Sequence, residues 1–205
     1  MAISSRSVIQ FTVLFLVIGL VALLSIVGTT FWLGERAQVY FNLANEARDT
    51  RTAAVEMRSA VQTAESSQRG FLLTGNQIYL SPYDVARTQA QRQLGILRQL
   101  LAPYPDSDTP VQRLSALLAQ KLDELDQTVT LKRAGHDQEA MAIITSNKGK
   151  TLMDEANVFF SGIIRKADDR LTTGVVEQRT NAGWLRLVSA IGAIAIIAVV
   201  GAAAI

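Results

Sequence analysis

Residues 8–33 read VIQFTVLFLVIGLVALLSIVGTTFWL, and residues 187–205 read LVSAIGAIAIIAVVGAAAI; neither stretch contains a charged side chain. Crossing about 30 Å of hydrocarbon takes roughly 20 apolar residues of α-helix. A helix is also one of the few structures that satisfies its own backbone hydrogen bonds in lipid. Trp32 lies at the end of the first stretch, where interfacial aromatic side chains are common. Both stretches therefore predict membrane-spanning helices.

The two predicted spans leave a polar segment, residues 34–186, long enough for one ordinary domain. Because two crossings return the chain to its starting side, we expect residues 1–7 in the cytoplasm and residues 34–186 outside it. The charges near the amino end are few, and the domain exceeds the roughly 60 residues over which the positive-inside rule is reliable. The inverse orientation therefore stays open. Because residues 187–205 run to the last residue, we expect the effector domain to be absent from this sequence.

The length of the first apolar stretch distinguishes an anchor from a cleavable signal peptide. Signal peptides have apolar regions of about 7–15 residues followed by a small-x-small cleavage site. Residues 8–33 are longer and no clear site of that kind comes after them. This pattern favours a retained anchor.

Composition excludes several function classes. The formal net charge is +2, and arginines such as Arg48 and Arg51 have acidic neighbours, so we expect no nucleic-acid partner. The chain has no cysteine, which excludes disulfides and thiolate metal sites. His136 is the only histidine, and no glycine-rich phosphate loop or nucleophile motif occurs. We therefore expect no catalytic residue, no metal, no cofactor and no enzymatic activity in this segment.

Residues that typically begin or end helices divide the central domain into helical segments. The first helix is expected to continue from the membrane span to about Leu73 and to close at Gly75, which tolerates the left-handed conformation. The second is expected from Pro82 to about Leu101, with Ser81 as its cap. No alternating strand pattern is present.

Two further helices follow in the same way. Thr109 begins a capping box for the third, which Gly135 should stop, and a short helix is expected over about 137–146. Thr151 is expected to cap the fourth, which runs without a proline into the second span. Each helix has an apolar stripe at three- and four-residue spacing, including Met57, Val61, Ala64 and Phe71; Tyr83, Ala86, Ala90, Leu97 and Leu101; Leu114, Leu118, Leu122 and Leu125; and Met153, Ala156, Phe160 and Ile163. The pattern predicts an all-α fold: an antiparallel four-helix bundle whose first and last helices continue into the membrane spans.

Residues 63–83 read TAESSQRGFLLTGNQIYLSPY. The ordered combination of QRG at 68–70, LTG at 73–75, YL at 79–80 and PY at 82–83 resembles the signature of CHASE sensory domains of the third class. The later stretch 135–154, which ends in Gly-Lys-x-Leu-Met-Asp, is also similar to this family. The resemblance implies an extracellular sensor module of bacterial histidine kinases or nucleotide cyclases that acts as a dimer.

The motif supplies the candidate ligand or signalling positions. Arg69 has forked donors that suit an anionic ligand or a carboxylate on another helix, while the simpler alternative is a pair with Glu65 one turn earlier. Gly70 would permit close approach of a neighbour, and we expect the tyrosine hydroxyls to reach solvent. The candidates are Glu65, Gln68, Arg69, Gly70, Thr74, Gly75, Tyr79 and Tyr83.

The leading hypothesis is the sensory and transmembrane part of a two-pass receptor in the bacterial inner membrane, with its domain in the periplasm or outside the cell. Its expected partners are the lipid bilayer, a second copy of the chain and an unidentified extracellular stimulus. The expected output is a histidine kinase of a two-component system or a nucleotide cyclase. Two alternatives stay open, a chemoreceptor-type ligand-binding bundle and a membrane-anchored structural bundle without signal output.

Overall fold

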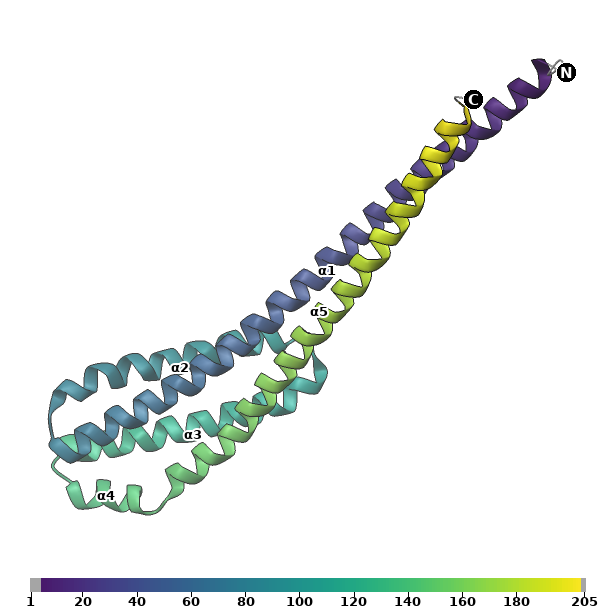
Figure 1. Cartoon of the computed structure of the whole chain (residues 1–205). Coiled ribbons are helices and arrows are strands. Elements are labelled where there is room, and N and C mark those ends of the chain that lie inside the picture. The colour runs from purple at the N-terminus through teal and green to yellow at the C-terminus, as the bar shows by residue number, and fades with distance from the viewer. Residues whose placement is uncertain (1–4, 204–205) are drawn as a thin grey trace. The chain divides into compact units, whose positions relative to one another are not determined.

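The computed structural model describes the backbone of residues 5–203 and the side chains of residues 13–14, 16–172, 183–184, 187, 190–194 and 197. All regular structure within residues 5–203 is helical (Figure 1), which confirms the all-α prediction. The elements in chain order are α1 (Ser5–Thr74), η1 (Gln77–Tyr79), α2 (Leu80–Leu101), η2 (Pro105–Ser107), α3 (Asp108–Arg133), α4 (Asp137–Thr145) and α5 (Lys148–Ala203).

Three residues with positive φ end or separate the helices. Gly75 has φ +67° directly after α1, and Gly135 has φ +80° after α3. Beyond Gly135, the backbone N–H of His136 donates to the carbonyl of Leu131 at 2.9 Å, as in a Schellman motif. Asn147, with φ +58°, separates α4 from α5. The predicted ends at Gly75 and Gly135 are therefore confirmed.

The predicted start of α2 was wrong. Ser81 is not its cap, because α2 begins at Leu80 directly after η1. The cap lies further upstream, where the Asn76 side chain accepts a hydrogen bond from the Ile78 backbone N–H at 3.0 Å. Since η1 leads into α2 already in a helical conformation, no side-chain cap is needed at Ser81.

The predicted caps of α3 and α5 were wrong for a similar reason. Thr109 lies inside α3, which starts at Asp108 immediately after η2 and has no side-chain cap. Thr151 lies inside the first turn of α5, and its hydroxyl donates to the Asn147 carbonyl at 3.2 Å. η2 ends directly before α3, and the turn at Asn147 comes directly before α5. Each helix therefore begins before the residue that was expected to cap it.

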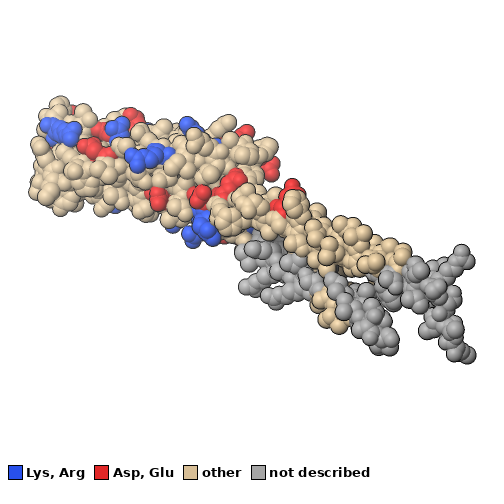
Figure 2. All heavy atoms as spheres, turned by 90° about the horizontal axis from the view of Figure 1, so that it is seen from above, with Lys and Arg blue, Asp and Glu red and all other residues tan. Residues whose placement is uncertain are grey.

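The chain divides into two compact units. One comprises Met1–Ala44 and Thr172–Ile205, and the other Asn45–Leu171. The second unit contains the core, to which α1, α2, α3 and α5 contribute, and the predicted apolar stripes are buried in it. α4 packs against α3. Basic and acidic side chains are interspersed over the face of this unit in Figure 2, as expected of a solvated helical surface.

The first unit contains the two apolar stretches. α1 has an apolar stretch long enough to cross a membrane, and none of it is buried. Its large apolar side chains are exposed, including Leu16 (69%) and Phe31 (79%). A Cβ added at Gly192 would lie 2.6 Å from Ile26 Cδ1, so the two helices approach closely there. Most side chains of the predicted second span, residues 187–205, lie outside the described set, and that span stays a prediction.

Candidate functional site

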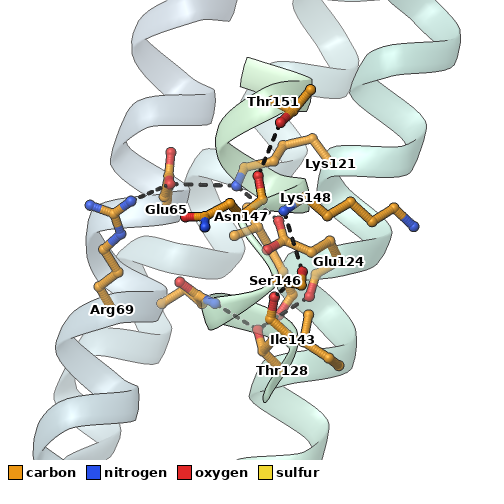
Figure 3. Close-up of polar contacts among 12 residues, drawn as sticks. Glu65, Arg69, Lys121, Glu124, Thr128, Ile143, Ser146, Asn147, Lys148 and Thr151 are labelled. Atoms are coloured by element: carbon orange, nitrogen blue, oxygen red, sulfur yellow. Dashed lines mark hydrogen bonds and ion pairs between the residues drawn. The ribbon is translucent and has the colours of Figure 1, made fainter. Parts of the chain in front are cut away.

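The candidate site is a cavity of about 440 Å³ in the unit Asn45–Leu171, where α1 ends and α5 begins. We call it the motif cavity. α1, α3, α4 and the start of α5 all contribute to its lining. Figure 3 shows the polar side chains of this region converging from these elements. The polar lining residues are Glu65, Gln68, Arg69, Lys121, Glu124, Asn147 and Lys150.

The helix ends place these side chains together. Because Gly75 closes α1, Gln68 and Arg69 lie in its last two turns. The turn at Gly135 reverses the chain so that α4 packs on α3, and a bend at Asn147 then leads α4 into α5. The helix end that carries the QRG motif therefore shares one cavity with Gly149 and Lys150.

A buried ion-pair cluster lies beside the cavity. Lys121 is only 3% exposed, and its Nζ lies 2.8 Å from Glu124 Oε2 and 3.4 Å from Glu65 Oε1. Arg69 donates to the same Glu65 oxygen at 2.7 Å (Figure 3). Removing one partner of a buried pair leaves an uncompensated charge, which typically costs about 3–5 kcal/mol. The cluster therefore links α1 to α3 as a unit.

Gln68 makes the second polar link between α1 and α3. Its Nε2 donates to Thr128 Oγ1 at 2.6 Å, and both side chains are buried. The Thr128 hydroxyl in turn donates to the Leu125 carbonyl at 2.8 Å. A buried amide needs such a partner because an unpaired polar group is costly in the interior.

Glu124 also meets the start of α5. A Cβ added at Gly149 would lie 2.6 Å from Glu124 Cδ, so a larger residue at this position would displace the Glu124 carboxylate. The N-terminus of a helix carries partial positive charge and free backbone N–H groups. The carboxylate of Glu124 thus lies at a favourable place, between Lys121 and the positive end of α5.

Seven of the eight candidate residues of the motif form two groups. Glu65, Gln68 and Arg69 line the motif cavity, and Arg69 makes the expected pair with Glu65. Gly70 and Thr74 lie at the end of α1, and Gly75 and Tyr79 lie in the connection that leads to α2. A Cβ at Gly70 would lie 2.5 Å from Tyr79 Cδ1, and the Thr74 hydroxyl donates to the Gly70 carbonyl at 2.7 Å.

Tyr83 lies apart from the cavity and differs from expectation. Its ring is buried, and its hydroxyl donates to Asp126 of α3 rather than reaching solvent. Arg87 forms an ion pair with the same carboxylate. Burial and the neighbouring Asp126 raise the pKa of Tyr83 well above its ordinary value. This contact joins α2 to α3.

Sequence reasoning missed the cavity residues outside the motif, including Lys121, Glu124 and Asn147. For two of these residues, the sequence contains a pattern that could have identified them. Lys121 and Glu124 fall among the apolar stripe positions of α3, where a charged side chain must either be paired or point away. Asn147 had no comparable signal beyond its place in a turn.

A second, more apolar cavity of about 230 Å³ lies elsewhere in the same unit, among α1, α3, α5 and the residues around η2. Next to it, the Arg170 guanidinium stacks over the Tyr104 ring, 3.6 Å from the ring centroid. Burial and nearby Glu46 raise the pKa of Tyr104. Among the described residues, no group of three acidic, histidine or cysteine side chains is placed to hold a metal ion.

Comparison with known proteins identifies a sequence family and a related structure. The sequence model of the CHASE3 domain matches residues 41–175. The sensor domain of the histidine kinase HK9 from Rhodopseudomonas palustris is similar in structure, with a TM-score of 0.55 and 28% sequence identity. The match covers 62% of this chain and 98% of that domain. No curated protein matches the chain.

Proposed function

The chain belongs to the CHASE3 domain family, and from this we propose that it is the sensory and membrane-spanning portion of a bacterial receptor. The family and the similar histidine kinase sensor domain support a sensory role in a receptor. Of the two expected outputs, the HK9 likeness favours a histidine kinase over a nucleotide cyclase.

The observation that carries the proposal is the convergence of two distant family-like stretches on one cavity. Glu65, Gln68 and Arg69 come from the motif of residues 63–83, and Gly149 and Lys150 come from the stretch 135–154. Residues that maintain a fold need not surround a cavity. Their meeting around a space of about 440 Å³ supports its role as the stimulus site.

The proposed architecture is an antiparallel four-helix bundle outside the cytoplasm on two membrane spans. The shared core of α1, α2, α3 and α5 supports the bundle. The exposed apolar side chains at the start of α1 support a membrane anchor, because a soluble protein rarely exposes so large an apolar surface. We further propose that the receptor acts as a homodimer, as the family resemblance implies.

The proposed signal is a movement of helices. α1 and α5 each contribute residues both to the unit with the motif cavity and to the unit with the apolar stretches. A change in the ion-pair cluster would alter the packing of α1 on α3. Shifts of about 1–2 Å or small rotations of packed helices are an established mode of switching.

The experiment uses this chain joined to the cytoplasmic part of a histidine kinase, with autophosphorylation in membranes as the readout. Glu65→Gln removes the charge that Arg69 and Lys121 share, so we expect basal phosphorylation to change several-fold. Glu155→Gln is the matched control, because it weakens an exposed pair with Arg113 away from the cavity. Equal phosphorylation in both variants and the wild type would count against the cavity as the signalling site.

A further inference from the structure

The charges around the motif cavity favour an anion. The lining holds Arg69, Lys121 and Lys150 against the carboxylates of Glu65 and Glu124. The first turn of α5 adds the positive end of a helix dipole, and the Glu124 carboxylate already occupies a place beside it at Gly149. A cation entering here would meet a positive neighbour beside each carboxylate that it approached.

Arg69 and Lys121 both contact Glu65, and each is positioned to bind a ligand carboxylate in its place. Arg69 is mostly exposed (63%), and the structure ties it to one oxygen of Glu65. Lys121 reaches that same oxygen only at 3.4 Å, longer than its 2.8 Å contact with Glu124. A carboxylate placed between Arg69 and Lys121 would find a forked donor and a buried ammonium group. Without a ligand, the Glu65 carboxylate therefore pairs with the same two cations that a ligand carboxylate would bind.

The remaining wall of the cavity is apolar. Leu73 is 79% exposed and Met141 is 46% exposed, although both are large apolar side chains. Leu72 and Ile144 continue this surface. A ligand body that covers these side chains removes their apolar surface from water, which favours binding.

Resting on the proposed function of this cavity as the stimulus site, we propose that the motif cavity binds a small organic monocarboxylate with an apolar body. The carboxylate lies between Arg69 and Lys121, and the body covers Leu73 and Met141. A dianion or a phosphate ester is disfavoured, because Glu65 and Glu124 repel a second negative charge. A neutral analogue is disfavoured because it leaves the cations without a new partner.

The test is calorimetric titration of the full chain in neutral detergent with hexanoate and with hexanamide, its uncharged counterpart. We expect hexanoate to bind and hexanamide to bind at least about tenfold more weakly, because hydrogen bonds to charged groups are the stronger ones. Arg69→Gln should weaken hexanoate by about tenfold or more. Arg92→Gln, which changes an exposed arginine of α2 outside the cavity, should leave the affinity unchanged.

A second variant tests the apolar wall without touching the ion pairs. Leu73→Ser should reduce the gain in affinity from butanoate to octanoate, and thermal melting should remain as in the wild type because Leu73 is exposed. Equal affinity for hexanoate and hexanamide, or no binding of any of these acids at millimolar concentration, would overturn the proposal.

The two proposals fail in different ways. Binding of hexanoate that leaves phosphorylation of the joined receptor unchanged supports the carboxylate site and contradicts its signalling role. Phosphorylation that responds to Glu65→Gln, with no acid bound, supports the signalling role and contradicts the carboxylate site.

Discussion

Lys121 shows how a single charged residue is held in the interior of this protein. It is 3% exposed and lies between Glu124 at 2.8 Å and Glu65 at 3.4 Å. Taking an ammonium group out of water costs several kcal/mol unless close carboxylates compensate. The position of Lys121 therefore depends on both α1 and α3, and a substitution of Glu65 in α1 also changes the charge environment of Lys121 in α3.

The Tyr83 hydroxyl group joins α2 to α3 through its hydrogen bond to Asp126. Tyr83→Phe removes the hydrogen bond to Asp126, so we expect the free energy of unfolding near pH 8 to fall by about 2 kcal/mol. The pKa of Tyr83 is raised from its ordinary value of 10.0. The unfolded chain therefore ionises this group first, and its contribution is complete below pH 10 and decreases as the pH rises further.

The measurement is denaturant unfolding of the full chain in detergent at several pH values between 8 and 11.5. We expect the difference between wild type and Tyr83→Phe to narrow above pH 10. Tyr79→Phe is the control, because the Tyr79 ring is partly exposed and packs on Gly70. A difference that stays constant through this range would contradict the role assigned to the buried hydroxyl.

The start of α5 meets α3 where Gly149 lies beside the Glu124 carboxylate. Gly149→Ala places a Cβ against the Glu124 carboxylate, so this carboxylate, which also contacts Lys121, must shift. We expect a loss of about 1–2 kcal/mol in the free energy of unfolding. Thermal or denaturant unfolding followed by circular dichroism measures it.

Gly95→Ala is the matched control for that substitution. Gly95 lies inside α2, and a Cβ there would have no atom within 4 Å. Alanine is favoured over glycine in a helix by about 0.5–1 kcal/mol, so this variant should be more stable than the wild type. If Gly149→Ala were also stabilising, the close approach of α5 to Glu124 would be refuted.

α5 runs from Lys148 to Ala203 without a break, through residues such as Ala182 whose side chains lie outside the described set. Inserting two alanines after Ala182 rotates the remainder of the helix by about 200°. In the receptor joined to a kinase, we expect basal phosphorylation to change markedly if α5 carries the signal.

Insertion of seven residues at the same place is the control. Seven residues turn a helix by about 700°, only roughly 20° short of two full turns. The faces of α5 before and after the insertion therefore keep nearly the same orientation relative to each other. Phosphorylation near the wild-type level is expected. Equal effects of the two insertions would argue against transmission through the orientation of this helix.

Much of the fold follows from periodicity, and much of the site does not. The apolar stripe positions such as Met57, Leu97, Leu125 and Phe160 are buried as predicted, because a 3.6-residue repeat places them on one face wherever the helix packs. Helix ends at Gly75 and Gly135 were predictable because few other residues accept positive φ. The helix starts at Ser81, Thr109 and Thr151 were not, because η1, η2 and the turn at Asn147 begin each helix earlier.

The helical class, the apolar stripes, the helix-ending glycines and the motif that places the chain in its family can all be read from the amino-acid sequence. These properties are local, since they depend on residues a few positions apart. By contrast, the shared cavity of Glu65, Gln68 and Arg69 with Lys121, Glu124 and the start of α5 is visible only in the folded chain. The reason is that ion pairs and cavities depend on distances between helices, and α5 returns to α1 and α3 only after the turn at Gly135 has reversed the chain.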